Sequence, residues 1–178
     1  VCPFLDLAQH TSSGLLRTSH VRKFALSALS LVAERGDSRA IMAVLLRLTD
    51  NNWIVRHAAV EAISALAEKG NQEAIGAVIL RFADEVPFVR YAAMETMGQL
   101  AEEGDPCCVV AVCAHVQSSD AYFQRLAVGT LSLIALEGDA HAIAALKNAA
   151  AALDAEDMVD ARWMVREAVG NALSALGV

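Results

Sequence analysis

The side chains with the most potential for chemistry are three cysteines that lie within seven residues of one another. Cys107, Cys108 and Cys113 could in principle bind a metal ion or form a disulfide, and Cys2 lies far from them in the sequence. Zinc needs ligands from separate elements or a Cys-x-x-Cys pair, and neither occurs. The spacing is also not that of a disulfide framework. We therefore expect unpaired thiols and a reducing compartment, such as the cytosol or the plastid stroma.

The other residue types that bind metals or catalyse reactions are scattered. The histidines are isolated from one another and none is followed by glutamate: His10, His20, His57, His115 and His141. Four carboxylates gather near residues 152–160 without the ligand order and central glycine of an EF-hand: Asp154, Glu156, Asp157 and Asp160. No glycine-rich phosphate loop and no Gly-x-Ser-x-Gly motif occurs. The sequence predicts no metal site, no cofactor and no catalytic centre.

Composition favours helices and argues against two classes of partner. Of the 178 residues, 56% are hydrophobic and only 5% are aromatic, with alanine, leucine and valine dominating. This composition is typical of closely packed helices. The formal charge of −7 would repel a nucleic acid backbone, and no uninterrupted apolar run reaches the roughly 18 residues of a membrane span. We expect a soluble, all-α protein that neither binds nucleic acid nor inserts into a membrane.

An internal repeat with a period of about 34 residues must position these side chains. Shifting the sequence by one period places four glycines in one column, each followed by Asp or Asn: Gly36, Gly70, Gly104 and Gly138. The same shift aligns small residues where helices must approach closely, as in the column of Ala25, Ala59, Ala93 and Ala127.

Each unit has the pattern of two antiparallel helices. Apolar residues recur with a period near 3.6 from Val55 to Lys69, which predicts a first helix over that range. Gly70 is placed to end this helix, and Asn71 to cap a second one that carries residues 74–82. Pro87 breaks the pattern before the next unit. Because such hairpins bury both apolar faces only by stacking, the fold class is an α-solenoid, an α-α superhelix of helix pairs.

The repeat also predicts the domain organisation. Residues 1–20 form an irregular N-terminal segment, and the repeat array covers residues 21–178. The array has four full repeats from about 21 to 153, an insertion at about 152–160 and a final half repeat at 165–178.

The strings VRHAAVEAISALAEKGN and VRYAAMETMGQLAEEGD resemble HEAT repeats of the phycobilisome-lyase-like subtype, and the resemblance covers most of the chain. An aspartate stands six residues before the arginine of each string. The resemblance implies a structural ladder of hydrogen bonds between repeats, with these pairs: Asp50 with Arg56, Asp84 with Arg90, and Asp160 with Arg166. In the fourth unit the same positions hold Ser118 and Gln124, which predicts a neutral ladder step there.

A basic column is one candidate for contact with a protein partner. If second helices line the concave surface, as is usual in solenoids of this type, one column on that surface contains Arg47, Arg81 and His115, with Leu46 and Leu80 beside it. Such a column could bind an acidic helix or tail. Alternatively, these cations only complement the dipoles of their own helices.

Aromatic residues at the turns that enter the first helices are a second candidate. Trp53 and Trp163 share a column and are expected to anchor a partner. The adjacent column is interpreted as hydrophobic staples of the helix entries, and it contains Ile54, Phe88, Tyr122 and Met164.

The sequence thus predicts a non-catalytic scaffold or adaptor that binds another protein, either alone or as a peripheral soluble subunit of a larger assembly. The resemblance leaves two alternatives open. One is a bilin-lyase-like chaperone, which would bind an open-chain tetrapyrrole and its acceptor protein. The other is a soluble subunit of a photosynthetic membrane complex.

Overall fold

The computed structural model describes residues 18–155 and 163–178, and their regular structure is entirely helical. The predicted α-solenoid of helix pairs is confirmed. Most of the N-terminal segment and most of the insertion, including Asp160, lie outside the described residues. No helix of the described ranges is both long and apolar enough to cross a membrane. The chain divides into two compact units, Val1–Leu100 and Ala101–Val178.

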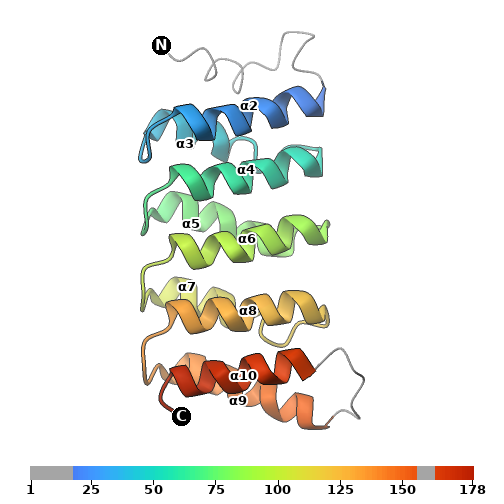
Figure 1. The fold of residues 1–178 in the computed structure, drawn as a ribbon, viewed down its shortest axis with the longest axis vertical. Helices are drawn as coiled ribbons and strands as arrows, with labels where there is room; N and C mark the ends of the chain where they lie inside the picture. The colour runs from blue at the N-terminus through green and yellow to red at the C-terminus, as the bar shows by residue number, and fades with distance from the viewer. Residues whose placement is uncertain (1–17, 156–162) are drawn as a thin grey trace. The chain divides into compact units, whose positions relative to one another are not determined.

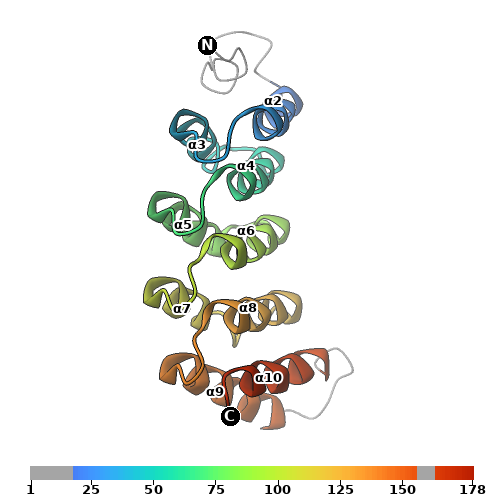
Figure 2. The same cartoon turned by 60° about the vertical axis from the view of Figure 1, so that its left-hand side comes forward.

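In the first unit, long first helices alternate with short second helices. The elements in order are α2 (Ser19–Val32), α3 (Ser38–Leu45), α4 (Trp53–Leu66), α5 (Gln72–Ile79), the 3₁₀ helix η2 (Leu80–Ala83) and α6 (Pro87–Leu100). Helices α2, α4 and α6 pack side by side in one layer (Figure 1), and α3 and α5 form a second layer beside them (Figure 2).

The second unit has the same alternation. Its elements are α7 (Pro106–Cys113), α8 (Ala121–Ile134), α9 (Ala140–Ala155) and α10 (Trp163–Ala175). Helix α8 packs against α10, and α7 packs against α9. Helix α10 corresponds to the first helix expected in the final half repeat, although it begins two residues before Val165.

The glycine column joins neighbouring hairpins as well as turning the chain. Gly36 has φ +86° and donates its N–H to the Leu66 carbonyl of the next first helix at 2.8 Å. In the second unit Gly104, with φ +80°, donates in the same way to Ile134 at 2.7 Å. Glycine is favoured here because other residues adopt this backbone region at a cost.

These bonds correct the predicted end of the first helix. The periodicity places it at Lys69, but α4 ends at Leu66 because Ala67 is extended. The Leu66 carbonyl is thereby left available to the glycine N–H of the preceding hairpin. Asn71 caps the next helix as expected, since its side chain accepts from the Ala74 N–H at 2.9 Å.

Stacking buries the apolar faces of successive hairpins. Ala59, Leu66 and Leu100 are at most 1% exposed, whereas Val32, which occupies the column of Leu66 in the first hairpin, is 54% exposed. Helix α4 packs against both α2 and α6, and its end is buried between them. The array therefore gains stability through nearest-neighbour interfaces.

Two glycine substitutions in the second unit should have opposite effects on stability. In Gly104→Ala the new Cβ would lie 2.7 Å from a methyl carbon of Leu136 at a positive φ, so we expect a loss of about 2 kcal/mol or more. In Gly129→Ala, within α8, the new Cβ meets nothing within 4 Å, and we expect a gain of about 0.5–1 kcal/mol. Urea unfolding followed by circular dichroism measures both, and equal effects would contradict the role assigned to the turn.

Candidate protein-binding surface

A ladder of buried ion pairs connects the hairpins of the first unit at the beginning of their first helices. The guanidinium of Arg56 donates to both carboxylate oxygens of Asp84 at 2.8 Å, and Arg22 binds Asp50 in the same way. The side chains of Arg56 and Asp84 are only 7% and 2% exposed. Each pair therefore links an arginine to the aspartate that begins the next repeat.

This geometry corrects the pairing that the sequence resemblance implies. Asp50 does contact Arg56, but through its main-chain carbonyl, which accepts from Nη1 at 2.9 Å. Arg90 likewise donates to the Asp84 carbonyl at 3.0 Å. The carboxylates point instead toward the preceding repeat. The contribution of Arg22 was missed, although it occupies the position of Arg56 in the preceding repeat and the register could have identified it.

Local hydrogen bonds fix each ladder carboxylate. Asp84 accepts from the Val86 N–H at 3.0 Å, and Asp50 accepts from the Asn52 N–H at 2.9 Å. Burial alone would raise the pKa of Asp84, but the hydrogen bonds and positive charges of its arginine partners outweigh burial and lower that pKa. The pKa of Asp50 is lowered for the same reasons. Both groups are therefore held as carboxylates.

The neutral ladder step in the second unit keeps part of this pattern. Ser118 Oγ accepts from the Asp120 N–H at 3.2 Å. The ladder aspartates of the first unit likewise accept from the N–H two residues further along the chain. Gln124 is buried and its Nε2 donates to the Val116 carbonyl at 2.9 Å, whereas its Oε1 has no partner. Arg166 donates to the Leu153 carbonyl at 2.9 Å. Its expected partner Asp160 lies outside the described residues.

The ladder also engages two of the three residues of the predicted basic column. Arg81 Nη1 lies 3.4 Å from Asp84 and donates to the Leu48 carbonyl at 3.1 Å, while Arg47 lies 3.9 Å from Asp50. Their side chains are only 20% and 14% exposed. The two arginines thus serve the interior, and little of their charge is offered to an acidic partner.

His115 does not add a cation in the second unit. Its ring lies 5.2 Å from that of Phe123, and burial lowers its pKa, which favours the neutral form. The neighbouring thiols behave as core groups: burial raises the pKa of Cys108 to about 12 and also raises that of Cys113. Cys107 is exposed. Within the described ranges, no group of three metal-binding side chains is assembled.

Apolar side chains remain exposed on the second-helix side of the first unit. Leu46 and Leu80 occupy equivalent positions after α3 and α5 and are 53% and 66% exposed, and Met42 of α3 is 47% exposed. We call these three residues the apolar strip. Gly76 of α5, the equivalent of Met42, has nothing within 4 Å of where a Cβ would be and leaves open space. The sequence identified the two leucines only as neighbours of the basic column.

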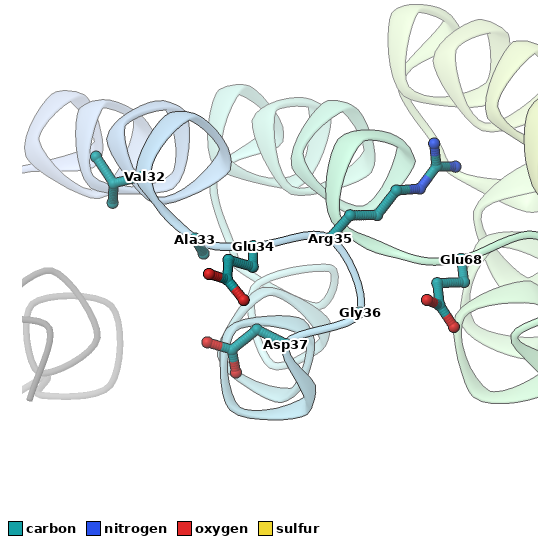
Figure 3. A pocket seen from close by; sticks show the side chains of 7 residues that line it. All are labelled: Val32, Ala33, Glu34, Arg35, Gly36, Asp37 and Glu68. Atoms are coloured by element: carbon teal, nitrogen blue, oxygen red, sulfur yellow. The ribbon is translucent and has the colours of Figure 1, made fainter.

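A polar pocket adjoins the strip at Leu80. Its volume is about 410 Å³, and ladder groups line it, including Arg81, Asp84 and Glu85. A second pocket, of about 450 Å³, lies at the turn between α2 and α3, where three carboxylates surround it: Glu34, Asp37 and Glu68 (Figure 3). Arg35 of that pocket donates to the Ala67 carbonyl, so its guanidinium also binds within the protein.

The predicted tryptophan anchors are both partly exposed, and one belongs to a cluster. Trp53 is 40% exposed and stacks on Phe88, with ring centroids 5.9 Å apart and an interplanar angle of 27°. Trp163 of the second unit is 53% exposed. Phe88, interpreted from sequence as a staple, is 61% exposed and lies on the surface.

Removal of one ladder carboxylate should change both the free energy of unfolding and its dependence on pH. Asp84→Asn removes the buried anionic partner of Arg56 and leaves only the exposed Glu85 at 3.2 Å, and we expect a loss of about 3 kcal/mol at pH 7. Because the folded-state pKa of Asp84 is lowered, its stabilisation is complete above the unfolded-state pKa of about 3.9 and is lost as the pH falls through the folded value. The wild type should therefore lose more stability between pH 5 and pH 2 than the variant, as measured by urea unfolding. Glu95→Gln, an exposed carboxylate of α6, is the control and should change neither quantity appreciably.

Comparison with known proteins supports this architecture. Residues 41–70, which include the strip leucine Leu46 and the ladder residues Asp50 and Arg56, match the HEAT repeat model. No curated protein matches the chain significantly.

Three solved structures share the fold. An engineered protein is 19% identical with a TM-score of 0.61, covering 98% of this chain and 79% of its own. The designed armadillo repeat protein YIII(Dq)4CqI is 16% identical with a TM-score of 0.63, covering 98% and 81%. A related design, YIII(Dq.V1)4CPAF in complex with the peptide (KR)4, is 15% identical with a TM-score of 0.64, covering 96% and 80%. Together with the repeat geometry, these matches show an armadillo-like α-solenoid fold, in which residues 41–70 are similar to the HEAT repeat.

Proposed function

We propose that this chain is a non-catalytic binding module that holds a segment of another protein against the second-helix side of its first unit. The observation that carries the proposal is the apolar strip. Met42, Leu46 and Leu80 are exposed while the arginines beside them are engaged by ladder aspartates. Exposed apolar side chains at repeated positions suit the apolar face of a helix or the alternate side chains of an extended peptide.

The similar structures support a peptide partner in general terms. One designed armadillo repeat protein of the same fold is in complex with a peptide. A solenoid also presents equivalent positions at each repeat, so a partner segment can contact several hairpins in succession. The pocket beside Leu80 offers the exposed carboxylate of Glu85 to polar atoms of such a segment.

The distribution of charge favours a partner that is not acidic. Residues 1–100 carry ten basic and ten acidic side chains, whereas residues 101–178 carry four basic and eleven acidic ones. The whole formal charge of −7 therefore belongs to the second unit. An acidic helix or tail, the partner expected from the basic column, would be repelled by that unit and would find Arg47 and Arg81 already paired.

Whether the module acts as a free adaptor or as a peripheral subunit is part of the same proposal, since both need a protein-binding surface. The bilin-lyase-like alternative gains no support from the described pockets. A tetrapyrrole needs a mostly apolar pocket, and both are lined largely by polar and charged residues.

Substitution of two strip residues should weaken peptide binding without unfolding the protein. Peptides selected against the wild-type chain from a displayed random library would be measured by fluorescence anisotropy. We expect the double variant Leu46→Ser with Leu80→Ser to bind the selected peptides with at least tenfold lower affinity, because central apolar contacts dominate such interfaces.

The matched control is Leu31→Ser, since Leu31 is an 85% exposed leucine of the same unit on a first helix. It should leave the affinity unchanged. Selected peptides that bind the double variant as tightly as the control would contradict the proposal, and so would a library that yields no binders.

A further inference from the structure

Three aromatic residues of the first helices in the first unit form one cluster, in which Trp53 and Phe88 are exposed and Tyr91 is half-buried. Trp53 is the first residue of α4, and Phe88 is the second residue of α6. The ring of Phe88 stacks on Trp53 and meets the ring of Tyr91 edge-on, with centroids 6.4 Å apart and an interplanar angle of 77°. We call Trp53, Phe88 and Tyr91 the aromatic ledge.

The core does not require the ledge. Val55 and Val89, which follow Trp53 and Phe88 along their helices, are fully buried and attach both helix entries to the interior. Phe88 nevertheless leaves 61% of its surface in solvent, where an apolar ring is unfavourable unless a partner covers it. The exposed ring faces are thus available for binding.

In the second unit an aromatic ring at the equivalent position contacts a guanidinium group. The positions of Phe88 and Tyr91 are occupied one repeat later by Tyr122 and Arg125. There the guanidinium of Arg125 lies over the Tyr122 ring, 5.3 Å from its centroid. In the first unit the chain supplies Tyr91 in place of that arginine, so the equivalent ring, Phe88, receives no guanidinium from this position.

Exposed carboxylates lie near the ledge residues in the sequence, on the same helices or just before them. Glu85, three residues before Phe88, has a side chain 79% exposed, and Glu61, two turns after Trp53, has one 62% exposed. Glu95, two turns after Phe88, is also exposed.

The nearby cations already have partners within the protein. Arg56 binds Asp84 and also reaches Glu85 at 3.2 Å, and His57 lies 3.4 Å from Glu61. Arg90 donates to the Asp84 carbonyl and lies 6.0 Å from the centroid of the Tyr91 ring. The same pairs involve Glu85 and Glu61, but both carboxylates stay mostly exposed and can accept further hydrogen bonds.

We infer that the aromatic ledge binds an arginine side chain presented by an extended segment of a second protein. The planar guanidinium stacks on the exposed ring of Phe88, on the face that Trp53 does not cover, as cations do on aromatic rings. Its N–H groups donate to the exposed Glu85 or Glu95 carboxylate in a charge-assisted pair. This surface is distinct from the apolar strip, so it holds whether or not the strip binds a peptide.

The intrinsic fluorescence of the protein can report on this site directly. The chain has two tryptophans, so Trp163→Phe leaves Trp53 as the sole one. Titration of that variant with the peptide GRGRGRG should change the Trp53 emission in a saturable way. Phe88→Ala, made in the same background, should weaken binding about fivefold because the stacked ring is lost. Glu85→Gln should weaken it about two- to threefold.

Two further peptides separate recognition of arginine from other interactions. The lysine peptide GKGKGKG carries the same charge without a planar group, and we expect it to bind several-fold more weakly. Equal affinity for the two peptides would overturn the inference in favour of charge attraction alone. Tighter binding of a proline-rich heptapeptide without cations would overturn it in favour of polyproline recognition.

Control variants make a negative result interpretable. Tyr122→Ala removes an exposed aromatic side chain of the second unit and should leave the titration unchanged. The double variant of Leu46 and Leu80 should also leave it unchanged, which separates the ledge from the apolar strip. Circular dichroism melting of the Phe88→Ala variant should match its parent, since the ring is mostly exposed. A folded Phe88→Ala protein with undiminished affinity would overturn the assignment.

Discussion

The buried bond between the arginine of one hairpin and the aspartate of the next is the interaction on which the first unit most depends. Two charged groups that are almost completely removed from water are tolerable only when each satisfies the other. Arg56 meets this condition by binding both carboxylate oxygens of Asp84 and the main-chain carbonyl of Asp50. One side chain therefore joins the starts of two successive repeats and fixes their spacing.

A second constraint acts at the opposite ends of the first helices. The turn glycine of each hairpin donates to a carbonyl at the end of the next first helix, as Gly36 does to Leu66 and Gly104 does to Ile134. This backbone bond requires close approach, which the small residues of the alanine columns permit. In the first unit neighbouring hairpins are therefore joined at both ends of their first helices, and the apolar side chains between them are buried.

The ladder also determines which surface remains for partners. Because Asp50 and Asp84 draw Arg47 and Arg81 inward, the second-helix side of the first unit presents leucine and methionine more than positive charge. On the first-helix side, aromatic rings lie beside exposed carboxylates. The unit thus offers two chemically different surfaces, while the second unit carries the net negative charge.

The period, the helical fold class and the glycine turns could be predicted from the sequence. These features depend on local patterns that recur in every repeat, such as apolar spacing within a helix and Gly70 followed by the capping Asn71. The exact end of α4 could not be predicted, because the extended backbone of Ala67 serves a hydrogen bond to a different hairpin.

The partners of the charged and aromatic residues could not be predicted from the sequence, because they depend on how the hairpins stack. Arg56 has one aspartate shortly before it, Asp50, and another in the next repeat, Asp84, and both spacings are compatible with a ladder. Stacking of the hairpins brings the carboxylate of the distant one to the guanidinium and leaves only a carbonyl of the nearer one. The exposure of Phe88 likewise depends on how α4 and α6 pack. From the sequence alone, an aromatic residue at this position can either pack against its own helix entry or lie on the surface. The repeat period shows which positions are equivalent, but the packing of the hairpins determines which residues contact one another.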